Sequence, residues 1–226
     1  MDGIKTIIWD WNGTLLDDTI ICNSIINNLL EQRNLPRLSL QKYKEIFKFP
    51  VKDYYQKAGF DFTQEDFKIP ADEFIVSYTD QVKLAKLHSE AGEVLECLKS
   101  RNIKQFILSA MEQNSLKKSI EQYGIHHYFQ AIYGINDHYA HSKTANASRL
   151  IADYNLNPLE VCLLGDTVHD HEVAESINCK CILIADGHQT KNRLLATGRL
   201  VLDRLIDVKN YLPPINNKKN ENCQKS

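Results

Sequence analysis

Two patterns of hydrophobic and polar positions divide the chain. From Gly92 onward, short apolar runs alternate with segments in which apolar residues recur every three or four positions. The short runs predict buried strands, and the longer spacing predicts amphipathic helices. The predicted strands are residues 103–110, 131–135, 160–166, 179–185 and 199–203, and the predicted helices are residues 94–101, 115–124, 142–155, 169–178, 190–198 and 205–212.

The first predicted strand is separated from the others by a long helical stretch. Residues 4–10 (IKTIIWD) form a β-branched run that ends on Asp10. Residues 17–87 then show apolar positions at helical spacing, with Asp18 or Thr19 as a helix N-cap. No convincing strand is predicted in this stretch, so it reads as an insertion between the first strand and the rest.

Strands that alternate with helices are typical of a parallel sheet with helices on both faces. The predicted fold is therefore α/β, with a Rossmann-like core of residues 1–16 and 88–212 and an all-helical cap at residues 17–87. The tail, residues 213–226 (PPINNKKNENCQKS), is polar and lacks apolar periodicity, so we expect it to be disordered.

The composition argues against several classes of protein. A net charge of −2 provides no basic field for nucleic acid. No apolar run approaches the ~20 residues that a membrane span needs. The N-terminus shows no signal-peptide pattern, so we expect a cytoplasmic protein whose six cysteines are reduced.

Reactive side chains gather where predicted strands end, which is where open α/β sheets bind ligands. Scattered carboxylates without a His/Cys cluster suit a hard cation such as Mg²⁺. A hydroxyl and an ammonium beside them suit a phosphate group, and a carboxylate there can be a nucleophile that forms an aspartyl-phosphate. The residues concerned are Asp10, Asn12, Thr14, Ser109, Lys143, Asp166 and Asp170.

In this order, four motifs resemble those of the haloacid dehalogenase superfamily of phosphohydrolases. Its first motif, D-x-D-x-T, is matched by residues 10–14 except at Asn12, and its second, a strand ending in Ser or Thr, by FILSA with Ser109. Its third, a helical Lys, is matched by Lys143, and its fourth, G-D-x-x-x-D, by residues 165–170. The resemblance covers residues 4 to about 205. The helical insertion is similar to a C1 cap, as in the phosphoglycolate phosphatase-like branch.

The resemblance implies a Mg²⁺-dependent hydrolase of a small phosphomonoester such as phosphoglycolate, acting as a monomer or homodimer on a small phosphorylated metabolite. It implies that Asp10 is the nucleophile and that Thr14 stabilises the motif loop. The implied catalytic residues are Asp10, Asn12 and Lys143, the implied substrate-binding residues are Thr14, Ser109, Ala110 and Lys143, and the implied metal ligands are Asp10, the Asn12 backbone carbonyl, Asp166 and Asp170.

Asn12 departs from the family pattern. Phosphatases of this family carry an Asp there, which protonates the leaving oxygen and later activates water, whereas an amide does neither. The alternatives are a catalytically weakened regulatory protein that binds Mg²⁺ and phosphate, or a phosphonatase-type C–P hydrolase that uses a cap lysine, Lys48 or Lys52. Deamidation of Asn12-Gly13 is a further hypothesis. Another alternative is a substitute proton donor among His138, His141, His169 and His171, with His141 and His169 as the best candidates, although each of the four is by default a solvated surface histidine.

Overall fold

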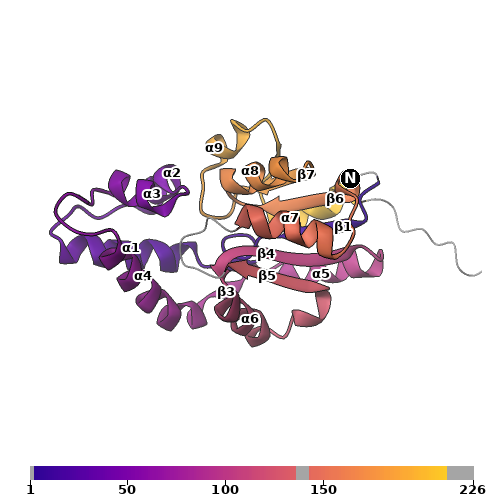
Figure 1. The fold of residues 1–226 in the computed structure, drawn as a ribbon, viewed down its shortest axis with the longest axis horizontal. Helices are drawn as coiled ribbons and strands as arrows, with labels where there is room; N and C mark the ends of the chain where they lie inside the picture. The colour runs from indigo at the N-terminus through magenta and orange to yellow at the C-terminus, as the bar shows by residue number, and fades with distance from the viewer. Residues whose placement is uncertain (1–2, 136–142, 213–226) are drawn as a thin grey trace, which may run out of the picture.

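The fold is a parallel sheet enclosed by helices, with a separate group of helices at one end (Figure 1). The computed structural model describes residues 3–135 and 143–212. The predicted tail therefore lies outside the described residues. The sheet order is β5-β4-β1-β6-β7-β8. The bounds of these strands are Thr6–Trp9 (β1), Lys104–Glu112 (β4), Ala131–Ile135 (β5), Val161–Gly165 (β6), Lys180–Ile184 (β7) and Leu200–Leu202 (β8).

All neighbouring strands of this sheet pair in parallel. Alternate residues of β1 point to opposite faces: Ile7 and Trp9 pack into one core and Ile8 into the other. The first core is covered by α5, Ala91–Ser100, α6, Gln113–Gln122, and the 3₁₀ helix η4, Leu205–Tyr211, and the second by α7, Lys143–Asp153, α8, Val168–Ser176, and α9, Lys191–Leu195. Short 3₁₀ helices lie at His126–Tyr128 and Pro158–Glu160. This arrangement confirms the predicted Rossmann-like fold.

Helices also fill most of residues 19–84, and α1, α2, α3 and α4 lie at one end of the molecule (Figure 1). We call residues 19–84 the helical region. It has its own apolar core, which includes Ile25, Leu29 and the fully buried rings of Tyr43 and Tyr54. Its helices are Thr19–Gln32 (α1), Leu40–Ile46 (α2), Val51–Ala58 (α3), Lys68–Gln81 (α4) and the 3₁₀ helix Val82–Leu84.

The prediction of no strand between residues 17 and 87 is wrong. Leu16–Asp17 (β2) pairs antiparallel with Lys86–Leu87 (β3), where the chain leaves the core and returns to it. The His88 amide extends the pairing by donating to the Leu15 carbonyl at 3.0 Å. Two-residue strands are too short to show an alternating pattern, so sequence reasoning had no signal for them.

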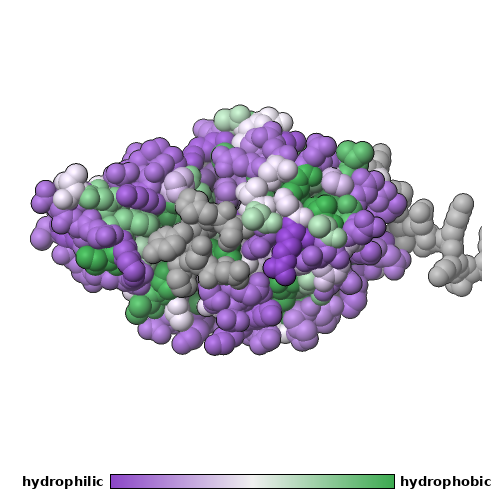
Figure 2. All heavy atoms as spheres, viewed as in Figure 1, coloured by the Kyte–Doolittle hydropathy of each residue, from purple (hydrophilic) through white to green (hydrophobic). Residues whose placement is uncertain are grey.

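The surface is mostly hydrophilic on the face shown in Figure 2, with smaller apolar areas between the polar ones. Among the described residues, no helix combines the length and the apolar character that a membrane crossing would require.

Candidate active site

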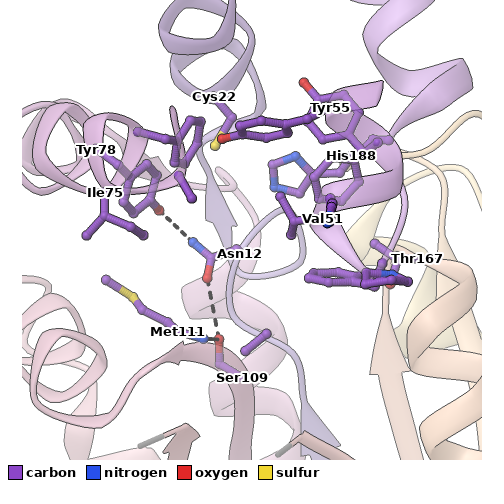
Figure 3. Close-up of a pocket in the computed structure, with 18 of the residues that line it drawn as sticks. Asn12, Cys22, Val51, Tyr55, Ile75, Tyr78, Ser109, Met111, Thr167 and His188 are labelled. Atoms are coloured by element: carbon purple, nitrogen blue, oxygen red, sulfur yellow. Dashed lines mark hydrogen bonds between the residues drawn. The ribbon is translucent and has the colours of Figure 1, made fainter. Parts of the chain in front are cut away.

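A cavity of about 620 Å³ is lined both by the carboxyl ends of the sheet strands and by the helical region. Asp10, Ser109 and Lys143 line it from the sheet. The opposite side is largely apolar (Figure 3). We use the term apolar wall for five half-buried residues of this lining: Phe47, Val51, Phe74, Ile75 and Met111.

Three buried carboxylates meet at the sheet end of the cavity. Asp10 directly follows β1, Asp166 directly follows β6, and Asp170 lies in the first turn of α8. Because β1 and β6 are parallel neighbours, their carboxyl ends coincide. One oxygen of each carboxylate lies within 4.8 Å of the others. Asp170 is held by the Thr167 amide and hydroxyl, which donate to its Oδ2 at 3.0 and 2.7 Å.

Lys143 links two of these carboxylates. It is the first residue of α7, and its Nζ donates to Asp10 Oδ1 at 2.7 Å and to Asp170 Oδ1 at 2.6 Å. Burial lowers the pKa of Lys143, but Asp10 and Asp170 outweigh burial and hold this pKa above its ordinary value. Asp10, Lys143, Asp166 and Asp170 together form what we call the sheet-end site.

The sheet-end site concentrates negative charge on buried side chains. Burial, together with the Asp170 and Asp166 carboxylates, raises the pKa of Asp10 to about 8, against the opposing effect of Lys143. Burial likewise raises the pKa of Asp166. For Asp170, the contact with Lys143 outweighs burial and lowers the pKa. One lysine thus offsets part of the charge of three carboxylates, and a divalent cation would offset the remainder.

The turn after β1 shapes the site through backbone geometry. Gly13 has φ +73°, and a Cβ there would lie 2.4 Å from Asp166 Oδ2, so a side chain fits neither sterically nor conformationally. Thr14 is fully buried and is not part of the cavity lining. Its hydroxyl donates instead to Asp166 Oδ1 at 2.8 Å, so Thr14 orients a carboxylate.

The side chain of Asn12 lies between the two sides of the cavity (Figure 3). Its amide nitrogen donates to Asp18 Oδ2 at 2.8 Å and to the Tyr78 hydroxyl at 2.6 Å. Its carbonyl oxygen accepts from the Ser109 hydroxyl at 3.4 Å. Ala110 lines the cavity next to Ser109. The position that an aspartic acid would occupy therefore carries no ionisable group, and both sides of the amide are engaged.

Asp18 was expected to cap the first long helix, but its side chain accepts hydrogen bonds from other parts of the chain. It occupies the N-cap position of α1 but makes no capping hydrogen bond. Its Oδ1 accepts from the Gly13 amide at 3.0 Å, and its Oδ2 accepts from the Tyr78 hydroxyl at 2.6 Å. Burial raises the pKa of Asp18, but His188, Tyr78 and Asn12 outweigh it, so the pKa is lowered and the carboxylate stays ionised.

Like Tyr78, His188 is a residue near the site that sequence reasoning missed. It lies in the loop between β7 and α9, and its ring contacts Asp18 Oδ1 at 3.1 Å through Nε2 and the Tyr43 hydroxyl at 2.8 Å through Nδ1. Its backbone amide donates to Asp166 Oδ2 at 2.6 Å. Burial lowers the pKa of His188, but Asp18 outweighs it and raises the pKa to about 9. Its signal was its position, because DGHQT follows a predicted strand at the ligand-binding edge.

The described histidines that were considered as proton donors, His169 and His171, do not line the cavity. His169 Nδ1 lies 3.0 Å from Glu172, and the His169 ring packs on Phe49 with centroids 5.0 Å apart. His171 contacts Arg199 at 3.0 Å, away from the cavity lining. His138 and His141 lie outside the described residues.

The two lysines considered for Schiff-base chemistry also have partners. Lys48 forms an ion pair with Asp53 at 2.8 Å. Lys52 lines the cavity, and its ammonium lies 5.8 Å from the centroid of the Phe62 ring. Neither is placed in the sheet-end site, so a cap lysine would have to act from the far side of the cavity.

The parallel sheet reverses its order at β1, and the site lies at that switch point, as in ligand-binding Rossmann-like proteins. Fold and site thus define an α/β protein with a cluster of three buried carboxylates at its strand ends that could hold a metal ion. The sequence model for the haloacid dehalogenase-like hydrolases matches residues 7–184, and the chain therefore belongs to this family. The predicted family membership is confirmed.

Solved structures share the fold at low sequence identity. A hydrolase of the haloacid dehalogenase-like family from Streptococcus pneumoniae has a TM-score of 0.82 and 20% identity, with 93% of this chain and 99% of that chain covered. A protein from Haemophilus somnus described as a predicted phosphoglycolate phosphatase has a TM-score of 0.77 and 21% identity, with the same coverage of 93% and 99%. No curated protein sequence matches the chain.

Proposed function

We propose that the protein is a phosphatase that hydrolyses a small phosphomonoester with Mg²⁺ as cofactor, through an aspartyl-phosphate on Asp10. The observation that carries this proposal is the position of Asp10. Its carboxylate lines the cavity, is hydrogen-bonded to Lys143 and lies beside two more buried carboxylates. The similarity in fold to proteins described as phosphatases supports the same reaction class.

The residues present fit Mg²⁺. Hard cations bind carboxylate oxygens, and Asp10, Asp166 and Asp170 offer one each within 4.8 Å. Burial raises the pKa values of Asp10 and Asp166 even though Lys143 and His188 oppose the shifts, so these cations offset only part of the cost of ionising the two carboxylates. The backbone carbonyl of Asn12 would be a further ligand. When bound, the cation would neutralise charge on the phosphate oxygens.

The side chains of the chain itself would carry the two chemical steps. A carboxylate oxygen of Asp10 attacks the phosphorus atom, and the bond from phosphorus to the leaving oxygen breaks. Ser109 and Lys143 hold the remaining phosphate oxygens during the transfer. Water then cleaves the aspartyl-phosphate, which releases inorganic phosphate and regenerates Asp10. The helical region would act as a cap that excludes bulk water while the reaction proceeds.

Two alternatives make contrasting predictions. A regulatory protein that only binds Mg²⁺ and phosphate is favoured by Asn12, whose amide is engaged by Asp18 and Tyr78 and supplies no proton. A C–P hydrolase would need an amine near the substrate, and Lys52 in the cavity lining is the described lysine of the helical region that meets this condition. Phosphate release from ordinary phosphomonoesters distinguishes the phosphatase from both.

The test is phosphate release from a panel of small phosphomonoesters that includes phosphoglycolate, and from the acyl phosphate acetyl phosphate, with and without Mg²⁺. We expect turnover by the wild type, loss of turnover on chelation, and a decrease of about 10⁴-fold or more in Asp10→Asn, because removing a nucleophile costs up to about 10⁶-fold in other hydrolases. Turnover that persists in Asp10→Asn would overturn the proposal.

Mg²⁺ binding has a readout that does not depend on activity. At a Mg²⁺ concentration tenfold above its dissociation constant, the free energy of unfolding should rise by about 1.4 kcal/mol. Asp166→Asn should remove most of this increase. An equal increase in Asp166→Asn would place the cation elsewhere.

A further inference from the structure

The lining of the cavity also bears on which leaving group the substrate carries. Between the sheet-end site and the outside, the substrate would pass the apolar wall: Phe47, Val51, Phe74, Ile75 and Met111. The rings of Tyr54 and Tyr55 also line the cavity and are almost fully buried. The part of the substrate that extends away from the phosphate therefore meets mostly aromatic and aliphatic surface (Figure 3).

The charges along the cavity disfavour a second anionic group on the substrate. Among the described lining residues outside the sheet-end site and its neighbours Asp18 and His188, the acidic side chains are Asp53, Asp72 and Glu112 and the basic one is Lys52. The carboxylate of phosphoglycolate would have to leave water for an apolar surface with this one ammonium as partner. Burial of a carboxylate against such a surface is unfavourable unless cations and hydrogen-bond donors pair with it.

Asn12 restricts the leaving group independently of the wall. A poor leaving group, such as an alkoxide, needs a proton as its bond to phosphorus breaks, and Asn12 has none to give. A phenolate leaves without one, because phenols have a pKa of about 10 whereas alkyl hydroxyls resemble water, with a pKa of about 16. The site therefore suits a substrate whose oxygen departs as a stable anion.

We propose that the natural substrate is an aryl phosphate, a phosphomonoester of a phenolic hydroxyl whose neutral aromatic ring lies against the apolar wall. This inference rests on the proposed phosphatase function. Asp10 attacks phosphorus, the bond between phosphorus and the aryl oxygen breaks, and the oxygen leaves with the electron pair as a phenolate. The phenolate takes its proton from solvent, and water hydrolyses the aspartyl-phosphate as before.

Four substrates separate the two requirements with the wild-type protein alone. Phenyl phosphate combines a ring with a good leaving group, and benzyl phosphate keeps the ring but leaves as an alkoxide. Acetyl phosphate has a good leaving group, acetate, but no ring. Phosphoglycolate has neither a ring nor a good leaving group. We expect kcat/KM for phenyl phosphate to exceed that for benzyl phosphate by about 10²-fold or more, the usual contribution of general acid catalysis, and to exceed the values for both ring-free substrates.

Asn12→Asp tests the leaving-group argument. Because kcat/KM reports the steps up to departure of the leaving group, the new acid should raise the value for benzyl phosphate by about 10²-fold. The value for phenyl phosphate should rise much less. An equal rise for both substrates would overturn this part of the inference.

Ile75→Arg tests the wall, and its neighbour on α4 provides the control. Ile75 lines the cavity, whereas Val76 is 66% exposed and does not line it. Ile75→Arg should lower kcat/KM for phenyl phosphate by about tenfold or more, the usual cost of a lost apolar pocket contact, and raise the value for phosphoglycolate. Val76→Arg should change neither.

The outcomes distinguish the inference from the function on which it rests. Suppose that kcat/KM for benzyl phosphate or phosphoglycolate equals or exceeds that for phenyl phosphate, and that all turnover depends on Asp10. This result would overturn the proposal of an aryl phosphate substrate and leave the proposed phosphatase function intact. If the protein releases phosphate from none of the four substrates, acetyl phosphate included, both the aryl phosphate proposal and the proposed phosphatase function are overturned.

Discussion

The sheet-end site and the apolar wall face each other across one cavity and are built in opposite ways. The sheet-end site is a set of charged groups on the rigid ends of parallel strands, where ion pairs of 2.6 and 2.7 Å fix Lys143 between two carboxylates. The apolar wall belongs mainly to the helical region and contains no charge. The comparison suggests a division of labour in which the strand ends determine the reaction and the helical region determines which leaving group is accepted.

The largest effect on this comparison should come from Lys143→Met. It leaves the carboxylates of the sheet-end site without their cation, and breaking a buried ion pair costs about 3–5 kcal/mol. We expect this decrease in the free energy of urea unfolding, together with a loss of about 10²- to 10³-fold in kcat/KM.

The control for Lys143→Met is Lys191→Met, which removes a lysine whose 2.6 Å ion pair with Asp203 is solvent-exposed. Exposed pairs contribute less than about 1 kcal/mol. If the two variants lose the same stability, the sheet-end site is not the charge-coupled unit described above.

Gly13→Ala should disturb the sheet-end site through the backbone. At φ +73° an alanine is strained, and its Cβ would lie 2.4 Å from Asp166 Oδ2. We expect a stability loss of about 1–3 kcal/mol and a decrease in kcat/KM of more than about tenfold, because Asp166 must move.

Gly198→Ala is matched to this change, since Gly198 has φ +72° and nothing lies within 4 Å of the position that an alanine methyl group would take. It should lose about 1 kcal/mol from backbone strain and keep the wild-type kcat/KM. Thermal unfolding and phenyl phosphate kinetics on both variants check the prediction, which an unaltered kcat/KM in Gly13→Ala would contradict.

Tyr43→Phe should weaken the contact that joins the helical region to the strand ends. The Tyr43 hydroxyl on α2 lies 2.8 Å from His188 Nδ1 in the loop after β7. Losing this buried hydrogen bond should lower the free energy of unfolding by about 1 kcal/mol.

Tyr54→Phe removes a hydroxyl that is also buried but has no hydrogen-bond partner among the described residues. It should therefore leave the stability unchanged or raise it slightly. A greater loss in Tyr54→Phe than in Tyr43→Phe would show that His188 does not couple the two regions.

The two regions also differ in how far their sequences predict them. The strand ends follow from short-range pattern: a β-branched run ends at Asp10, another apolar run ends at Asp166, and parallel pairing brings the two together. The contacts of Asp18 depend instead on residues 60 and 170 positions away, Tyr78 and His188. No local pattern encodes such contacts.

The apolar wall could not be predicted from the sequence for a related reason. In the chain, Val51 and Ile75 look like ordinary core positions of amphipathic helices. Whether such a residue faces its own helical core or a substrate cavity depends on the angle at which the helices meet the sheet, which periodicity does not report. The predicted phosphoglycolate was drawn from the family resemblance, and the wall is the feature that argues against it.

Lys52→Gln should produce the smallest effect. It tests whether the helical region contributes charge to substrate binding. Lys52 lines the cavity but is exposed, and its ammonium lies 5.8 Å from the Phe62 ring centroid, so solvent screens much of its positive charge. If the wall selects substrates by burying a neutral ring, kcat/KM for phenyl phosphate should stay within about threefold of the wild type, since exposed charges are largely screened. A loss above tenfold would mean that the helical region contributes charge, which would return phosphoglycolate to consideration. Loss of phosphonate cleavage in this variant alone would instead assign Lys52 the amine role of a C–P hydrolase.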